Sequence, residues 1–386
     1  MERAKRRRRL VVSVVLIAVA GAAFALGARL GEPTSPPPQP SVASTLPVPQ
    51  LVGERLLTGV VGTTVSQRLR AAIAAGRLAG VVLFAENFPS RASGRRLIAS
   101  LQRIRRPARL RAPLLIMVDQ EGGQVKRVDG PPVASAAQMG ARGAAFSRQQ
   151  GAATAIDLRR LGINVDLAPV LDVARPGGVI AATERGFGAS AARVAATAVP
   201  FARGLQANGV AATAKHFPGL GAAAENTDFA AQRIGLPRRE LWTVDEAPYP
   251  AFIAAGGKLV MLSTAVYPVL SPAPAAFSRT IASGELRGRL GFRGVSMTDA
   301  LESAAVRSFG GPASAGLGAV RAGTDLLLFT DLGAAETASR ALVAQLRSGR
   351  LRRPAFEVSA QRVLDLRAGL SPPLPPGRRV AREDPR

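Results

Sequence analysis

The sequence predicts a (β/α)8 barrel of the TIM type, preceded by an N-terminal transmembrane or signal segment. Between about residues 50 and 370, short apolar runs alternate with longer amphipathic stretches, as in parallel α/β folds. Eight of these runs have the length of a buried strand, which is the number that closes a barrel. An open doubly wound sheet is the alternative, but no phosphate-binding glycine loop follows any strand.

Each expected strand is a short apolar run bounded by turn residues or by the start of a helical pattern. The eight strands are expected at residues 56–61, 80–85, 114–118, 164–168, 211–215, 259–263, 294–298 and 325–329. The segments between them have apolar residues at helical spacing, and these segments include residues 93–105, 147–161, 191–208, 238–255 and 334–348.

The N-terminus is expected to place this barrel outside the cytoplasm. A basic block (residues 1–9) precedes 19 residues without charge (10–28), which is long enough to cross a bilayer. Basic residues before such a segment predict a cytoplasmic N-terminus and an exported body. A cleaved signal peptide, with Ala23-Phe24-Ala25 as its cleavage motif, is the alternative. The length of the apolar run favours an uncleaved anchor.

The regions that flank the expected barrel (51–370) have different compositions. Residues 29–50 are rich in proline, which predicts an extended linker between the membrane and the barrel. Residues 371–386 are expected to form a disordered tail.

Composition excludes several kinds of site. The chain of 386 residues has no cysteine and one histidine, so disulfides, thiolate metal sites and multi-histidine metal sites are impossible. We therefore expect no metal and no cofactor. The net charge of +25 raises the possibility of nucleic-acid binding, but aromatic residues make up only 4% and no basic-aromatic motif occurs. Contact with an anionic cell surface is the preferred use of this charge, and the protein is expected to be a monomer.

Charged residues lie where the expected strands end. Asp119 and Asp299 each follow a strand directly, and Lys215 and His216 close another. Asp172 and Arg185 lie beyond the strand at 164–168. In a barrel these residues gather at the C-terminal end of the strands, where such folds carry their active sites. Paired carboxylates at such a site suit glycoside hydrolysis, and charged neighbours can bind sugar hydroxyls.

Four segments carry a resemblance to glycoside hydrolase family 3. IMVDQEGGQVKRV (116–128) resembles the family's VDQEGGRVQR segment, and GINVDLAPVLDV (162–173) resembles its GINxxxAPVxD segment. KHFPG (215–219) is similar to its sugar-binding strand end, and GVSMTDALES (294–303) to the segment around its nucleophile. KHFPG resembles the single-domain β-N-acetylhexosaminidase branch. The resemblance covers roughly residues 51 to 370.

The resemblance implies a role for each matching residue. Asp299 would be the nucleophile that forms a glycosyl-enzyme intermediate. The residues that would bind the terminal sugar are Asp119, Arg127, Arg185, Lys215 and His216. His216 is then a substrate-binding residue rather than the acid, and its alternative is a structural histidine at a strand end.

The segment after KHFPG departs from the family pattern. In the hexosaminidase branch, an Asp-Ser-His sequence supplies a histidine acid/base. Here Asn226-Thr227-Asp228 stands at the same spacing, and Leu220 replaces another histidine. Asp228 is the preferred general acid/base, because a carboxyl serves once its pKa is raised.

Two alternatives to Asp228 remain. One is that Glu225, or another carboxylate such as Glu302, acts as the acid. The other is that acid catalysis is lost. Smaller departures occur near Thr264, where the family often has a histidine, and at Ser303, where it usually has methionine.

The sequence therefore predicts an exported retaining hydrolase that releases terminal β-linked N-acetylhexosamine from cell-wall or chitin-type glycans. Its expected partners are an oligosaccharide or peptidoglycan-fragment substrate and, through the N-terminal helix, the membrane. The alternatives are a family member that acts on another β-glycoside and a catalytically impaired protein that binds cell-wall glycans.

Overall fold

The computed structural model describes residues 41–370. The expected basic block, the apolar segment 10–28, residues 29–40 of the linker and the tail 371–386 lie outside the described residues. Within the described part, no helix is both long enough and apolar enough to cross a membrane.

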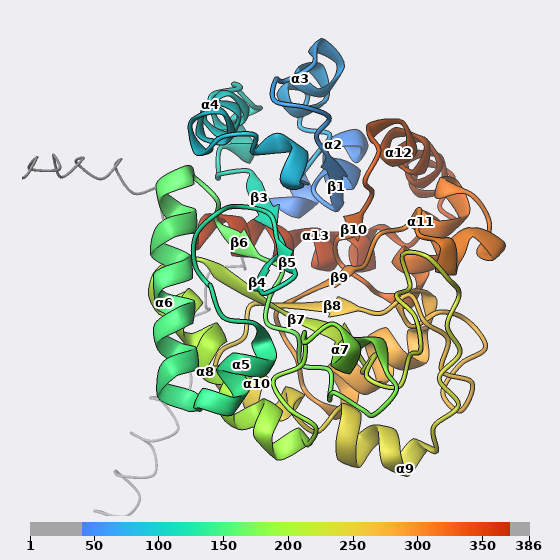
Figure 1. The fold of residues 1–386 in the computed structure, drawn as a ribbon. Coiled ribbons are helices and arrows are strands. Elements are labelled where there is room, and N and C mark those ends of the chain that lie inside the picture. Colours follow the sequence, from blue (N-terminus) through green and yellow to red (C-terminus); the bar gives the residue numbers. More distant parts are fainter. Residues whose placement is uncertain (1–40, 371–386) are drawn as a thin grey trace, which may run out of the picture. The chain divides into compact units, whose positions relative to one another are not determined.

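The body is a nearly closed barrel of eight parallel strands surrounded by helices (Figure 1). The strand order is β10-β1-β2-β3-β6-β7-β8-β9, and a bridge between Met297 and Leu326 joins the two end strands. All eight expected strands occur, most of them shorter than expected. Their bounds are β1 Leu56–Gly59, β2 Gly80–Val82, β3 Leu115–Val118, β6 Val165–Asp166, β7 Ala211–Phe217, β8 Leu259–Leu262, β9 Val295–Thr298 and β10 Leu327–Leu328.

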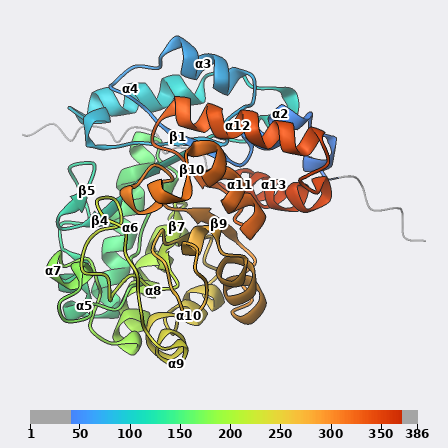
Figure 2. The same ribbon diagram turned by 90° about the vertical axis from the view of Figure 1, so that its right-hand side faces the viewer.

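The helices that connect the strands cover the outside of the barrel (Figures 1 and 2). The five expected helical segments all contain helix, and α3, α11 and α13 are additional long helices. The bounds are α2 Val48–Gly53, α3 Gln67–Ala74, α4 Arg91–Gln102, α5 Ala136–Arg142, α6 Ala144–Leu161, α7 Val179–Ala182, α8 Ala191–Ala207, α9 Arg238–Glu240, α10 Tyr249–Ala254, α11 Pro312–Ala322, α12 Leu332–Arg347 and α13 Arg353–Ala368.

The expected helix at 238–255 is interrupted. It consists of α9, a π-helical turn at Leu241–Asp245 and, after a break, α10. Pro248 caps the start of α10. Because proline has no N–H to donate, it cannot continue a helix from the preceding turn, and the break falls just before it.

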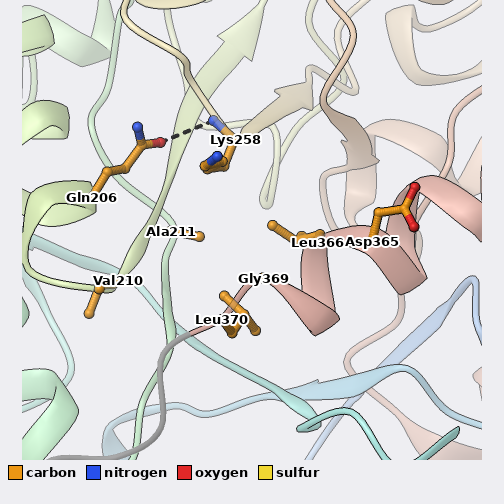
Figure 3. A pocket seen from close by; sticks show the side chains of 9 residues that line it. Gln206, Val210, Ala211, Lys258, Asp365, Leu366, Gly369 and Leu370 are labelled. Atoms are coloured by element: carbon orange, nitrogen blue, oxygen red, sulfur yellow. Dashed lines mark hydrogen bonds between the residues drawn. The ribbon is translucent and has the colours of Figure 1, made fainter.

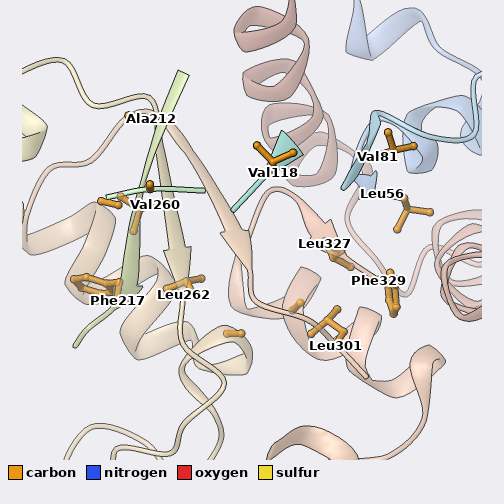
Figure 4. Packing of buried hydrophobic residues seen from close by; sticks show 14 of the residues in the cluster. Leu56, Val81, Val118, Ala212, Phe217, Val260, Leu262, Leu301, Leu327 and Phe329 are labelled. Atoms are coloured by element: carbon orange, nitrogen blue, oxygen red, sulfur yellow. The ribbon is translucent and has the colours of Figure 1, made fainter. Parts of the chain in front are cut away.

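Alternate residues of each strand face the two sides of the barrel wall. Leu57, Val82 and Met117 belong to a cluster inside the barrel. Their neighbours in sequence, such as Leu56 and Val81, pack outward against the helices (Figure 4). This alternation is the period-2 pattern of a strand, and burial on both sides explains why the strands read as continuous apolar runs.

The folded body begins earlier than expected. The prediction of a linker up to residue 50 is wrong for residues 41–50, because α2 begins at Val48 and the side chains of Ala43 and Leu46 are buried. The Ala43 N–H donates to Gln361 Oε1 at 3.0 Å, and Arg353 donates to the Leu46 carbonyl at 3.0 Å. These apolar side chains and hydrogen bonds attach the segment to α13.

The N-terminal end of the barrel contains a small cavity of about 140 Å³ (Figure 3). Residues around the start of β7 and at the end of α13 line it, and Gln206 Oε1 accepts a hydrogen bond from the Lys258 N–H at 3.0 Å. Among the described residues, Asp365 is its only acidic lining residue. The chemistry expected from the sequence lies at the other end of the strands.

Candidate active site

A cavity of about 230 Å³ opens at the C-terminal end of the barrel strands. Its lining includes every site residue that the sequence predicts: Asp119, Arg127, Arg185, Lys215, His216, Asp228 and Asp299. These residues come from four different strand ends and the loops that follow them. The remaining lining is largely apolar and includes Phe84, Met261 and Leu328.

A buried network of charges forms one wall of this cavity. Lys215 Nζ lies 2.6 Å from Asp119 Oδ1 and 2.7 Å from Glu121 Oε1. Arg185 binds Glu121 through two hydrogen bonds of 2.8 Å, and Arg127 lies 3.3 Å from Asp119. The network fixes three cations and two carboxylates along one side of the cavity, and such charged groups form short hydrogen bonds with polar ligands.

The mutual pairing sets the ionisation of this network. Burial alone would raise the pKa of Glu121, but the charges of Arg185 and Lys215 outweigh it and hold that pKa well below its usual value. The same balance, with Lys215 and Arg127, lowers the pKa of Asp119. Burial lowers the pKa of Lys215, but the two carboxylates outweigh it and raise that pKa. All three groups are therefore charged at neutral pH.

A short hairpin between Asp119 and Arg127 brings these two side chains together. Strands β4 (Gln120–Gly122) and β5 (Val125–Lys126) pair antiparallel, and Gln120 Oε1 accepts the Arg127 N–H at 3.1 Å. Gly122 and Gly123 have φ values of 95° and 56°, which favour glycine. A Cβ on Gly122 would lie 2.2 Å from the Ala134 carbonyl oxygen. The hairpin is absent from the sequence prediction, although its residues lie within the 116–128 segment.

Asp172 fixes the position of His216 through hydrogen bonds. The ring Nδ1 lies 2.7 Å from Asp172 Oδ2, and the His216 backbone N–H donates to Oδ1 of the same carboxylate at 3.0 Å. Asp172 is fully buried, and it also accepts the Leu220 N–H at 2.7 Å. Asp172 therefore fixes both the ring and the backbone of the loop that follows. With Nδ1 bound to Asp172, the Nε2 atom is the ring nitrogen left for a substrate.

Asp299 follows β9 directly. Its backbone N–H donates to the Leu262 carbonyl at 3.2 Å, and its Oδ1 accepts the Ala300 N–H at 2.8 Å. Burial and the negative charge of Asp228 raise the pKa of Asp299, and the His216 ring opposes this rise. The carboxyl group thus combines access to the cavity with a fixed orientation.

Asp228 lies on the loop between β7 and α9. Asn226 donates to Asp228 Oδ2 at 3.2 Å and accepts the Asp228 N–H at 3.1 Å. The carbonyls of Thr227 and Asp228 accept the N–H groups of Ala305 and Ala304, each at 3.2 Å. Two backbone hydrogen bonds therefore join this loop to the segment that follows Asp299.

Apolar side chains cover Asp228 on one side only. Leu220 is buried, but Phe229 is 79% exposed and Asp228 itself is exposed. The loop is thus open to solvent on the side of Phe229, and bound substrate would have to supply the missing cover.

Of the other candidate acids, neither lines the cavity. Glu302 accepts hydrogen bonds from the Thr330 and Asp331 N–H groups at 3.1 Å, so its carboxylate holds the loop before α12. Glu225 is exposed. Of the three candidate acids, Asp228 is therefore the one that lines the cavity with Asp299.

Comparison with known proteins places the chain in a family. Residues 48–366 match the model of the glycosyl hydrolase family 3 N-terminal domain. The chain belongs to glycoside hydrolase family 3. This match covers nearly the whole described barrel, as the four sequence segments predict.

Two relatives with glycosidase names agree with this assignment. An uncharacterized secreted glycosyl hydrolase of Arthroderma benhamiae is 37% identical over 342 residues, which cover 86% of this chain and 96% of the relative. A beta-hexosaminidase of Xylella fastidiosa is 39% identical over 283 residues, which cover 71% of this chain and 82% of the relative.

Solved structures of similar proteins share the fold. The β-N-acetylhexosaminidase of Beutenbergia cavernae has a TM-score of 0.77 and 35% identity, and the alignment covers 83% of this chain and 98% of that protein. The β-N-acetylglucosaminidase of a Paenibacillus strain has a TM-score of 0.79 and 35% identity. This second alignment covers 84% of this chain but only 63% of that longer protein.

The smaller departures from the family 3 pattern lie away from the cavity lining. Thr264 and Ser303 are buried, and the hydroxyl oxygens of both have no hydrogen-bond partner. Neither residue lines the cavity, so these two positions affect the site through packing rather than direct contact.

Two functional carboxylates were not assigned a role from the sequence. Glu121 bridges Lys215 and Arg185, and Asp172 orients His216. Glu121 lies two residues after Asp119, which was already a candidate. Because residues two apart in an extended segment project to the same side, this spacing is the signal that indicates Glu121. Asp172 was placed beyond its strand, but its contact with His216 depends on the path of the following loop.

Proposed function

We propose that the protein is a retaining glycoside hydrolase that releases terminal β-linked N-acetylhexosamine. The observation that carries the proposal is the single cavity that Asp299 and Asp228 share with the sugar-binding network. Membership of family 3 and the named hexosaminidase and N-acetylglucosaminidase relatives support this substrate.

Asp299 acts as the nucleophile in the first step. Its ionised carboxylate attacks the anomeric carbon and forms a glycosyl ester, while the carboxylic acid of Asp228 gives its proton to the departing glycosidic oxygen. In the second step ionised Asp228 takes a proton from water, and this water attacks the anomeric carbon. The ester bond to Asp299 breaks, and the sugar leaves with its original β configuration.

The charged wall binds the terminal sugar. Asp119 accepts hydrogen bonds from hydroxyl groups, and Arg127, Arg185, Lys215 and His216 donate to sugar oxygens. Charge-assisted hydrogen bonds of this kind are short and directional, so they position the anomeric carbon against Asp299.

Replacement of a histidine acid by a carboxyl affects which molecule can attack the glycosyl ester in the second step. We call this molecule the acceptor. In the second step Asp228 is ionised, and it repels an incoming anion such as phosphate while accepting water. We therefore assign hydrolysis, rather than phosphorolysis, to this site.

Several observations support an extracytoplasmic location. The apolar segment 10–28 follows a basic block, and one relative is named a secreted glycosyl hydrolase. We propose that the barrel acts on glycans outside the cytoplasmic membrane, such as fragments of peptidoglycan or chitin-type oligosaccharides, and that segment 10–28 anchors it.

The proposal is tested by measuring turnover of an aryl β-N-acetylglucosaminide and, for comparison, turnover of the matching aryl β-glucoside. Faster turnover of the N-acetylated sugar, together with loss of activity in Asp299→Asn, supports it. A preference for the glucoside would assign a different sugar. Tight glycan binding without turnover would assign a binding protein.

A further inference from the structure

The end of the barrel opposite the active site carries an unusual concentration of arginine. In a (β/α)8 barrel, segments that precede strands lie at the N-terminal end. The segment between α4 and β3 contains five arginines and no acidic residue: Arg103, Arg105, Arg106, Arg109 and Arg111. The end of α12 and the start of α13 add Arg347, Arg350 and Arg352, all exposed.

The acidic residues of α13 at this end bond to α13 neighbours rather than to the arginines of the segment after α4. The exposed Asp365 accepts a hydrogen bond from Gln361 at 2.7 Å, and Glu357 pairs with Arg353 at 2.7 Å. Glu54 and Asp325 are fully buried, and they pair with Arg367 and with Arg287, respectively. Their charges are therefore satisfied beneath the surface.

A cavity lies within the basic surface. It has a volume of about 270 Å³, and its lining includes Arg106, Arg111, Arg159 and Gln102. The positive charges of Arg106 and Arg111 beside this hollow attract a group with negatively charged oxygens, such as a phosphodiester.

The N-terminal part of the folded body lies beside this surface. Arg109 donates a hydrogen bond of 2.8 Å to the Thr45 carbonyl, and Arg353 donates to the Leu46 carbonyl at 3.0 Å. Residue 41 is therefore close to the basic surface, and the apolar segment 10–28 precedes it in sequence. Clusters of arginine close to a membrane surface attract the headgroups of anionic lipids.

We propose that this surface, which we call the basic end (Arg103, Arg105, Arg111, Arg350 and Arg352), docks on the phosphate headgroups of an anionic phospholipid membrane. No large exposed apolar or aromatic side chain lies among described residues 103–113 or 347–352, which favours a charged surface over the stacking that single-stranded nucleic acid requires. Because the active site lies at the other end of the strands, the docked enzyme keeps its cavity open to glycan.

The test uses residues 41–370, which lack the apolar segment. We expect this part to fold on its own, because the alignment of this chain with the Beutenbergia cavernae structure covers 98% of that protein. Its cosedimentation is measured with vesicles of mixed phosphatidylglycerol and phosphatidylcholine and with vesicles of phosphatidylcholine alone. We expect binding only to the anionic vesicles, with at least about tenfold weaker binding when salt is raised from about 50 to about 500 mM.

A charge-matched pair of variants locates the surface. The test variant changes the five arginines of the basic end to Gln, and we expect its affinity for anionic vesicles to fall by at least about tenfold. The control variant changes five exposed arginines elsewhere to Gln, namely Arg148, Arg193, Arg233, Arg239 and Arg307. It has the same net charge and should retain most of the binding.

Three results would overturn the proposal. One is absence of binding to anionic vesicles by a protein whose circular dichroism shows it to be folded. Another is an equal loss of binding in both variants, which would reduce the effect to net charge. The third is binding to a soluble polyanion, such as polyphosphate or DNA, without binding to vesicles. None of these results depends on glycosidase activity.

Discussion

Asp228 and Asp299 line the same cavity from different loops, and the negative charge of Asp228 helps to raise the pKa of Asp299. The two carboxyl groups are therefore electrostatically linked before any sugar binds. This link makes the pKa of the proposed nucleophile depend on the charge of Asp228, which mutation of Asp228 should reveal.

The first prediction concerns this pH dependence. In Asp228→Asn, the neutral side chain no longer opposes ionisation of Asp299, so the pKa of Asp299 falls. Because the nucleophile must be ionised, the acidic limb of kcat/KM should move to lower pH. The measurement is the pH profile of an aryl glycoside whose leaving group needs no proton. An unmoved acidic limb would show that Asp228 does not act on Asp299.

The second prediction concerns proton transfer. Asp228→Gly should lose about 10²- to 10⁴-fold in activity on a disaccharide, which needs a protonated leaving group, and much less on an activated aryl glycoside. Azide should restore turnover of the activated substrate and yield the β-glycosyl azide. Glu225→Gly is the matched control, because Glu225 lies on the same loop but does not line the cavity. If the control loses activity and Asp228→Gly does not, Glu225 is the acid.

The third prediction concerns the charge network. Glu121→Ala leaves Lys215 and Arg185 without their common partner, and breaking a buried ion pair costs about 3–5 kcal/mol. Urea unfolding should show this loss of stability. Glu184→Gln, at an exposed position beside Arg185, should change the free energy of unfolding by about 0.5 kcal/mol or less. Equal stability of the two variants would contradict the network's role.

The network also predicts the direction of a pH effect on stability. The pKa of Glu121 in the folded protein is lower than its usual value, so its stabilising contribution is complete at neutral pH. That contribution should be lost as pH falls from the usual glutamate range towards the folded-state pKa. The loss should be absent in Glu121→Gln.

The fourth prediction concerns the acceptor. Adding phosphate should not speed turnover, and the product should remain the free sugar. Ionised Asp228 repels the phosphate anion during the second step, as argued above. Sugar 1-phosphate as a product, with equal or faster turnover in phosphate, would show that the site accepts the anion.

The strands and their polar ends are largely predictable from the sequence, because both physical signals are local. A buried strand is a short apolar run, and a residue that follows it directly must lie at the strand's C-terminal end. Asp119, Lys215 and Asp299 were placed correctly in this way. Pro248 is also a local signal, since proline interrupts a helix. It was missed because the helical pattern of residues 238–255 is otherwise continuous.

The contacts among these residues were less predictable, because they depend on loop paths. The hairpin of β4 and β5 decides that Arg127 reaches Asp119, and the loop after β7 decides that Asp172 meets His216. The packing of residues 41–50 on α13 is also a long-range contact, since Ala43 and Gln361 are far apart in sequence. A proline-rich composition alone could not indicate it.

The central claim is that Asp299 forms a covalent bond with the sugar. A 5-fluoro N-acetylglucosaminyl fluoride should trap this intermediate, because fluorine beside the ring oxygen slows the second step more than the loss of fluoride. Mass spectrometry of digested protein should find the sugar on the peptide that contains Asp299, and Asp299→Asn should show no adduct. An adduct on another residue, or undiminished turnover in Asp299→Asn, would contradict the claim.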